Sequence, residues 1–211
     1  RLSLYENGDL WKERYFTIEN GIWSSIHKEN FEKNNDFWSE AGKPIFVFKD
    51  VLSFSLKGKE DVFYRTKQFD LDGDVGYSIY SQASVDKNQE FSLVFGYLNS
   101  SNYSSFDISS KEFTITHYEN GEFVAGHRDK FKRDKGFNSY NIQKYNGELT
   151  FYINDAKVYN CKIWDFKGTE AGVAVSGKGD GFVRDLILYV WFNQEQSEYL
   201  EDVFLNDYEE D

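Results

Sequence analysis

The sequence predicts an all-β domain, a sandwich of two antiparallel sheets. Three observations lead to this fold class. Short runs alternate between apolar and polar residues with a period of two, which is typical of strands with one face in a core. Aromatic residues make up 19% of the chain, and they favour pleated, half-buried surfaces. The Asn-Gly dipeptide suits tight hairpin turns and occurs four times, at Asn7-Gly8, Asn20-Gly21, Asn120-Gly121 and Asn146-Gly147.

The strands can be placed in chain order from the alternation. We expect an N-terminal hairpin over residues 10–26, closed by Asn20-Gly21. The clearest pattern follows at residues 91–97, where Phe91, Leu93, Phe95 and Tyr97 fall on one face while Ser92 and Gly96 fall on the other. Further strands are expected at residues 112–117, 148–153, 173–175 and 182–191. The single proline, Pro44, indicates a loop or a sheet edge.

Charge and composition divide the chain into three segments. We expect an N-terminal hairpin extension over residues 1–30, the sandwich over residues 31–192 and an acidic tail over residues 193–211. The tail holds eight of the acidic residues and no Lys or Arg. It is predicted to be either disordered or a short helix, with Tyr199, Leu200, Val203 and Phe204 on one side, that docks to a neighbouring subunit or domain.

Several partner classes are excluded by the same numbers. The net charge is −12, of which the tail carries −8, so the body has no clustered positive charge for nucleic acid or anionic lipid. No apolar run reaches membrane-spanning length, so direct membrane insertion is not expected. The single cysteine, Cys161, excludes an internal disulfide and is expected to be a small buried residue. The chain starts at Arg1 and contains no Met, so we expect a processed start, and an extracellular or cell-surface setting is favoured over a cytoplasmic one.

The order of features from Phe31 to Tyr189 resembles bacterial concanavalin A-like modules, which are related in fold to laminin G domains and family-16 glucanases. The segments that carry the resemblance are residues 31–38 (FEKNNDFW), 69–80, 91–103 (FSLVFGYLNSSNY), 118–121 (YENG), 149–155 (LTFYIND) and 184–186 (RDL). The resemblance implies a jelly-roll sandwich. It implies less about function, because such modules occur in secreted glycan-degrading systems, adhesins and intracellular multidomain proteins.

No catalytic apparatus is apparent in the sequence. Family-16 glucanases carry two carboxylates on one strand face, in an ExDxxE or ExDxE run, and no predicted strand contains such a run. Glu60-Asp61 and Glu201-Asp202 are adjacent pairs, which a strand would point to opposite faces. We therefore predict a protein that is not an enzyme, with glycoside hydrolysis as the least favoured alternative.

The sequence contains one candidate metal site and no other cofactor site. Asp70, Asp72 and Asp74 alternate around Gly73, a pattern that can converge on calcium but that a turn between strands explains equally well. The three histidines, His27, His117 and His127, lack the paired spacing of a zinc site. No cofactor other than calcium at this turn is indicated.

The remaining surface favours binding. Sugar rings stack on aromatic side chains, and Asn groups bond their hydroxyls. We therefore predict a non-catalytic, lectin-like module that binds carbohydrate through aromatic and Asn-rich loops at one sandwich edge. The predicted ligand-binding residues are Trp38, Tyr97, Asn99, Asn102, Tyr103 and Trp164. The alternative is a protein-interaction or scaffold domain within a larger assembly.

Overall fold

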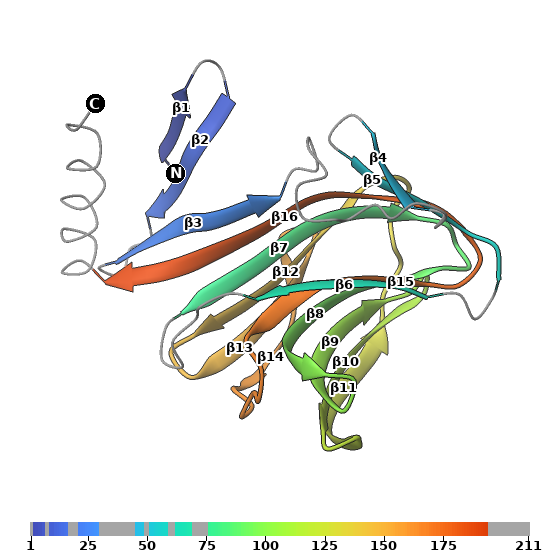
Figure 1. The fold of residues 1–211 in the computed structure, drawn as a ribbon. Helices are drawn as coiled ribbons and strands as arrows, with labels where there is room; N and C mark the ends of the chain where they lie inside the picture. Colours follow the sequence, from blue (N-terminus) through green and yellow to red (C-terminus); the bar gives the residue numbers. More distant parts are fainter. Residues whose placement is uncertain are drawn as a thin grey trace.

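The computed structural model describes the backbone of residues 2–6, 9–16, 21–29, 45–48, 51–58, 62–68 and 76–193. It describes the side chains of residues 51–58 and 76–191. Every regular element within these ranges is a β-strand, and none of the described residues forms a helix that could span a membrane. The strands form two antiparallel sheets that pack face to face (Figure 1), as the sequence predicts.

The larger sheet has the strand order β1-β2-β3-β16-β7-β12-β13-β14, with β5 also paired to β16 and β4 paired to β5. Its strands are β1 (Leu2–Glu6), β2 (Asp9–Phe16), β3 (Gly21–Glu29), β4 (Ile45–Phe48), β5 (Val51–Leu56), β7 (Tyr77–Val85), β12 (Asn138–Tyr145), β13 (Glu148–Ile153), β14 (Ala156–Lys162) and β16 (Gly179–Asn193). The long strand β16 pairs with β5 over its first residues and with β3 over its last. The predicted N-terminal hairpin is present as β2 paired with β3.

The smaller sheet has the order β11-β10-β9-β8-β15-β6. Its strands are β6 (Val62–Gln68), β8 (Glu90–Asn99), β9 (Asn102–Ile108), β10 (Glu112–Glu119), β11 (Glu122–Lys130) and β15 (Glu170–Ser176). Strands β8 to β11 follow one another as hairpins, so neighbours in sequence are also neighbours in the sheet. This arrangement places side chains from β8, β9 and β10 side by side on each face.

Alternating side chains fill the space between the sheets. Phe91, Leu93 and Phe95 of β8 are fully buried, as are Phe106 and Ile108 of β9. Aromatic rings meet across the two sheets: Phe91 stacks on Tyr140 of β12 at 5.0 Å between centroids, and Phe106 meets Phe151 of β13 edge-on at 5.3 Å. The predicted core faces of residues 113–117, 149–153 and 173–175 are confirmed by their burial.

One predicted face is wrong. Tyr97 was expected on the same face as Phe95, but Phe95 is buried in the core while Tyr97 lines the opposite side of the sheet. The cause is Gly96, whose φ of 57° lies in the left-handed region, together with a register shift between β8 and β9 after Phe95. Such a β-bulge inserts an extra residue and reverses the alternation beyond it. The bulge therefore turns Tyr97 out of the core.

The hairpin turns agree with the Asn-Gly prediction where they are described. Asn120-Gly121 joins β10 to β11 with φ values of 52° and 81°, and Asn146-Gly147 joins β12 to β13 with 50° and 75°. Two consecutive positive φ values identify type I′ turns. Asn7 and Asn20 lie outside the described residues. Asn154-Asp155 forms a further turn of this kind between β13 and β14, which the search for Asn-Gly did not find.

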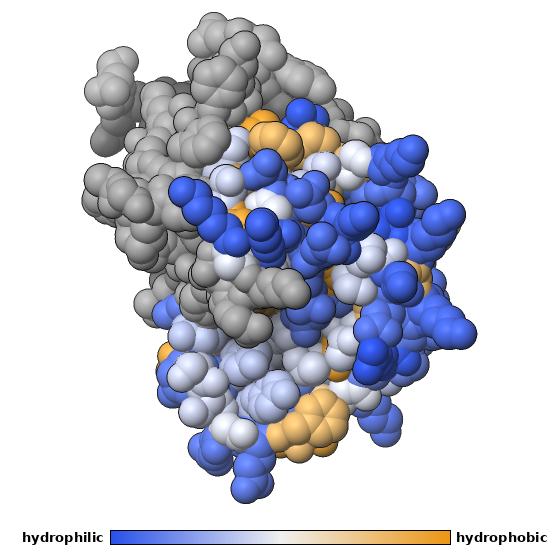
Figure 2. Space-filling model, turned by 90° about the vertical axis from the view of Figure 1, so that its right-hand side faces the viewer, coloured by the Kyte–Doolittle hydropathy of each residue, from blue (hydrophilic) through white to orange (hydrophobic). Residues whose placement is uncertain are grey.

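The described residues on the face shown in Figure 2 are mostly hydrophilic. On the face shown in Figure 2, hydrophobic residues occur in small separate groups among charged and polar ones. Five large hydrophobic side chains among the described residues are clearly exposed, namely Leu98, Phe123, Val124, Phe137 and Phe182. Three of them, Leu98, Phe123 and Val124, lie at the ends of the β8–β9 and β10–β11 hairpins.

Candidate functional site

A groove with a volume of about 520 Å³ lies on the outer face of the smaller sheet. Its lining alternates in sequence with the core residues, because successive side chains of a strand point to opposite faces of the sheet. Strands β8, β9, β10 and β15 each contribute. The lining residues are Glu90, Ser92, Val94, Tyr97, Ser100, Tyr103, Ser105, Asp107, Thr116, Tyr118, Ala174 and Ser176.

The floor of the groove consists of small side chains, several of them hydroxyls. The Ser105 hydroxyl donates a hydrogen bond to Asp107 Oδ2 at 2.8 Å and lies 2.6 Å from Thr116 Oγ1. Since a serine hydroxyl has one proton, Thr116 is the donor in the second contact. The small floor leaves the volume open, and the hydroxyl chain fixes the Asp107 carboxylate in place.

Carboxylates gather at one end of the groove. Burial raises the pKa of Asp107, and hydrogen bonds from Ser92 and Ser105 partly offset the increase. Burial also raises the pKa of Glu90, and the nearby charges of Asp107 and Glu112 add to this effect. The carboxyl groups of Glu90 and Asp107 are thus close enough to interact electrostatically. The sequence search considered carboxylates along a single strand, whereas these two come from neighbouring strands β8 and β9.

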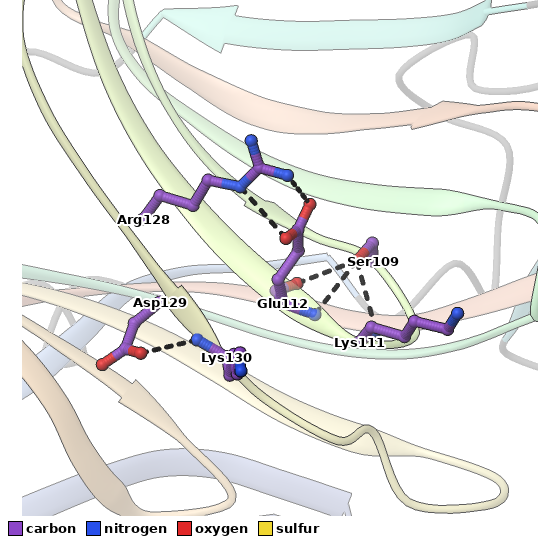
Figure 3. A network of polar contacts seen from close by, with 6 residues as sticks. All are labelled: Ser109, Lys111, Glu112, Arg128, Asp129 and Lys130. Carbon is purple, nitrogen blue, oxygen red and sulfur yellow. Dashed lines mark hydrogen bonds and ion pairs between the residues drawn. The ribbon is translucent and has the colours of Figure 1, made fainter.

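A third carboxylate near Glu90, that of Glu112, forms an ion pair with Arg128 (Figure 3). Arg128 of β11 donates through Nε at 3.0 Å and through Nη2 at 2.5 Å, one bond to each carboxylate oxygen. The hydroxyl of Ser109 accepts the backbone N–H groups of Lys111 and Glu112, which fixes the β9–β10 turn. The charge of Glu112 is therefore balanced by Arg128, and Glu112 itself is not part of the groove lining. No Lys, Arg or His occurs among the described residues that line it.

Tyrosines occupy the other end. Tyr103 of β9 and Tyr118 of β10 are direct partners across the two strands, and their rings stack with centroids 5.2 Å apart. Burial, followed by the neighbouring Tyr118 and Asp107, raises the pKa of Tyr103. Tyr97 joins this end because of the bulge at Gly96. The groove thus has an aromatic end and an acidic end.

Two of the predicted ligand residues, Asn99 and Asn102, lie in the turn beside the tyrosines. Asn99 Oδ1 accepts hydrogen bonds from the Ser101 N–H at 2.9 Å and from Asn102 Nδ2 at 3.1 Å. Asn102 Oδ1 accepts the backbone N–H of Asn120, which belongs to the next hairpin, at 3.1 Å. These amides tie the two hairpin ends together and shape the rim of the groove. Their contact with a ligand remains a prediction.

Trp164 lies on the other side of strand β10. Its ring stacks on His117 with centroids 5.1 Å apart, and His117 is buried in the interior, where it bonds Ser104 Oγ at 2.8 Å and Glu119 Oε1 at 3.1 Å. Trp164 lines a smaller cavity of about 200 Å³, which Tyr77 and Phe166 also line. The structure therefore brings Tyr97 and Tyr103 together in the groove but places Trp164 at a separate cavity.

The remaining predicted positions have different outcomes. Trp38 and the calcium candidates Asp70, Asp72 and Asp74 lie outside the described residues. Within the described part of the chain, no group of three or more His, Cys, Asp or Glu side chains could hold a metal ion. Cys161 packs against the core, and burial, followed by the charge of Glu148, raises its thiol pKa to about 11. At neutral pH this thiol is protonated, and it is a poor nucleophile in that form.

Sequence reasoning missed Glu90, Asp107 and Tyr118. Glu90 and Tyr118 flank predicted strands at outward positions, so the period-two pattern could have marked both as facing away from the core. Asp107 lies on β9, a strand that the sequence analysis did not predict, although Phe106 and Ile108 on either side of it carry the same alternation. The pattern could not show that Glu90, Asp107 and Tyr118 share one groove, because that depends on which strands are neighbours.

The sequence matches no protein-family model, and the search of curated proteins finds no relative. Solved structures do resemble it. The endo-β-1,3-glucanase of Pyrococcus furiosus superposes with a TM-score of 0.57 at 10% identity, over 84% of this chain and 98% of that one. The laminarinase catalytic domain of Thermotoga maritima gives 0.55 at 11% identity, over 79% and 98%. The binding domain of botulinum neurotoxin DC, solved with rat synaptotagmin II, gives 0.50 at 13% identity, over 78% and 48%. These likenesses establish the concanavalin A-like sandwich fold.

Proposed function

We propose that this chain is a non-catalytic carbohydrate-binding module that holds its ligand in the groove on the smaller sheet. The observation that carries the proposal is the composition of that groove: stacked tyrosines at one end, hydroxyls along the floor and two carboxylates at the other end. Its volume of about 520 Å³ lies within the range of roughly 300–1,000 Å³ that small-molecule pockets occupy.

The chemistry of the lining suits a sugar. Tyrosine rings offer apolar faces to the CH groups of a pyranose, and their hydroxyls can bond its oxygens. The carboxylates of Glu90 and Asp107 accept hydrogen bonds from sugar hydroxyls. Solved structures of this fold include glucan-hydrolysing enzymes, which makes glucans the first ligands to test.

The proposal places the site on the sheet face and uses the edge loops as its rim. Tyr97 and Tyr103 keep their predicted binding role within the groove. Asn99 and Asn102 close the rim through their hydrogen bonds to the turns. Trp164 is not part of the proposed site, because it lies on the opposite side of β10.

Binding of oligosaccharides, measured by isothermal titration calorimetry after a glycan array, tests this site. We expect Tyr103→Ala and Asp107→Asn to lower the affinity. Phe182→Ala is the matched control, because Phe182 is an exposed aromatic residue (45%) on the larger sheet. Thermal unfolding of each variant verifies folding. Failure of every glycan to bind, or unchanged binding by both groove variants, would contradict the proposal. A protein partner lost on removal of residues 193–211 would then favour the interaction-domain alternative.

Glycoside hydrolysis is the second candidate, and the electrostatic interaction between the carboxyl groups of Glu90 and Asp107 favours it. Glycosidases need one protonated and one ionised carboxyl group on either side of the scissile bond. Glu90, whose pKa is raised by burial and by Asp107 and Glu112, has the environment of a proton donor. Release of reducing ends from polysaccharides distinguishes the two functions. Turnover that disappears in both Glu90→Gln and Asp107→Asn would replace the non-catalytic proposal with an active site.

A further inference from the structure

An exposed aromatic residue, Phe123, lies just beyond the tyrosine end of the groove. Phe123 is the second residue of β11 and pairs with Tyr118, which lines the groove. Its side chain is 60% exposed, although its ring meets Tyr118 edge-on at 6.0 Å between centroids. A large aromatic side chain in this position is continuous with the groove and still open to solvent.

Gly126 shows on which face the Phe123 ring lies. Gly126 pairs with Thr116, another groove residue, so a side chain at position 126 would point to the groove face. A Cβ atom built there would clash with the backbone oxygen of Ile115 on β10 and would lie 2.9 Å from Cε2 of Phe123 and 3.0 Å from its Cζ. The Phe123 ring therefore lies against β11 at Gly126, where a larger residue would displace it. More than half of the Phe123 surface remains exposed to solvent.

The two ends of the groove are too far apart for a single sugar. Asp107 and Tyr103 lie four residues apart on the same strand, which corresponds to about 13 Å. Phe123 extends the aromatic end by a further strand, because β11 follows β10 in the sheet. A ligand that touches both ends must therefore contain several linked rings.

The charge of the groove adds a second restriction. Glu90 and Asp107 line it, and no described cationic side chain does. The Arg128 guanidinium is bonded to Glu112 through Nε and Nη2, so its charge is paired with that carboxylate. Negative charge repels anionic ligands. Uronic acid and sulfated glycans are therefore disfavoured.

We propose that Phe123 is a stacking subsite for one ring of an uncharged, linear oligosaccharide that spans the groove from the acidic end to the β10–β11 hairpin. This inference rests on the proposed function and specifies its ligand class. The Tyr103–Tyr118 pair holds the inner rings, and Phe123 holds the outermost one.

Affinity as a function of chain length tests the subsite. Neutral glucan oligosaccharides of one to six units are titrated against the wild type, Phe123→Ala, Phe123→Leu and the control Phe182→Ala. We expect wild-type affinity to rise with length. Both Phe123 variants should bind the longest oligosaccharide about three- to tenfold more weakly, the contribution of one aromatic contact. They should bind the shortest one like the wild type, and the control should match the wild type at every length.

Several results would overturn the subsite. Unchanged affinity of Phe123→Ala for long chains, or equal weakening at every length, would show that Phe123 does not hold an outer ring. Wild-type affinity in Phe123→Leu alone would show that apolar bulk suffices and that no ring stacks. In each case, weaker binding by Tyr103→Ala would leave the proposed function standing. Absence of binding by the wild type would overturn both, and stronger binding of a sulfated analogue would refute the charge argument.

Discussion

The replacement of Gly96 by alanine tests whether the bulge that turns Tyr97 into the groove requires glycine at this position. Gly96 has a φ of 57°, and a Cβ atom there would lie 2.7 Å from Cδ1 and 2.8 Å from Cγ of Phe166. The phenyl ring of Phe166 is held in place by edge-on contacts with Phe95 at 5.4 Å and with His117 at 5.9 Å. Both the backbone and the space therefore require glycine at this position.

The expected cost has two parts. A non-glycine residue in the left-handed region loses about 1–2 kcal/mol. Displacement of the Phe166 ring is a case of overpacking and costs about 1–3 kcal/mol. The free energy of unfolding should therefore fall by about 2–5 kcal/mol, a large part of the stability of a typical domain. Gly147→Ala is the matched control, because Gly147 has a φ of 75° but nothing within 4 Å of the added atom.

Urea denaturation of both variants measures the difference. We expect Gly147→Ala to lose only the backbone part, about 1–2 kcal/mol, and Gly96→Ala to lose more. In a Phe166→Ala background, the cost of Gly96→Ala should drop towards that of the control, because the ring atoms are gone and only Phe166 Cβ remains, at 3.0 Å. Equal losses at positions 96 and 147, or an unchanged cost after removal of the Phe166 ring, would refute the reasoning.

Three further predictions concern buried and half-buried groups. Because burial raises the pKa of Asp107 above 3.8, its contribution to the free energy of unfolding should be lost as the pH rises through the folded-state pKa. The difference in unfolding free energy between the wild type and Asp107→Asn should therefore shift against the wild type between about pH 4 and 7, and parallel pH profiles would contradict this. Phe151→Ala, at a fully buried ring that meets Phe106 at 5.3 Å, should lose about 3–5 kcal/mol in urea denaturation, and a loss below 1 kcal/mol would speak against the assigned core. Cys161, with its pKa near 11, should react slowly with iodoacetamide at pH 8 in the native state and rapidly in urea; equal rates would show an accessible thiol.

The fold was largely predictable because it depends on short-range pattern. Leu149, Phe151 and Ile153 point into the core as their spacing indicates, and Asn146-Gly147 makes the tight turn that its dihedral freedom permits. The prediction failed at Tyr97, where one glycine in the left-handed region reversed the alternation. A glycine inside a strand pattern is the signal for such a bulge, so the reversal could have been considered from the sequence.

The candidate site was less accessible to sequence reasoning, and the reason is geometric. Asp107 lies between Phe106 and Ile108, so its outward direction follows from the alternation of β9 alone. Its cross-strand partners, Ser92 and Thr114, are on β8 and β10, and their proximity follows only from the order and register of the strands. A search for carboxylates along one strand finds only residues of that strand, whereas a groove across a sheet is lined by residues of several neighbouring strands. For an antiparallel meander such as β8 to β11, the hairpin register therefore needs to be proposed first, and candidate sites should then be sought along rows of cross-strand partners.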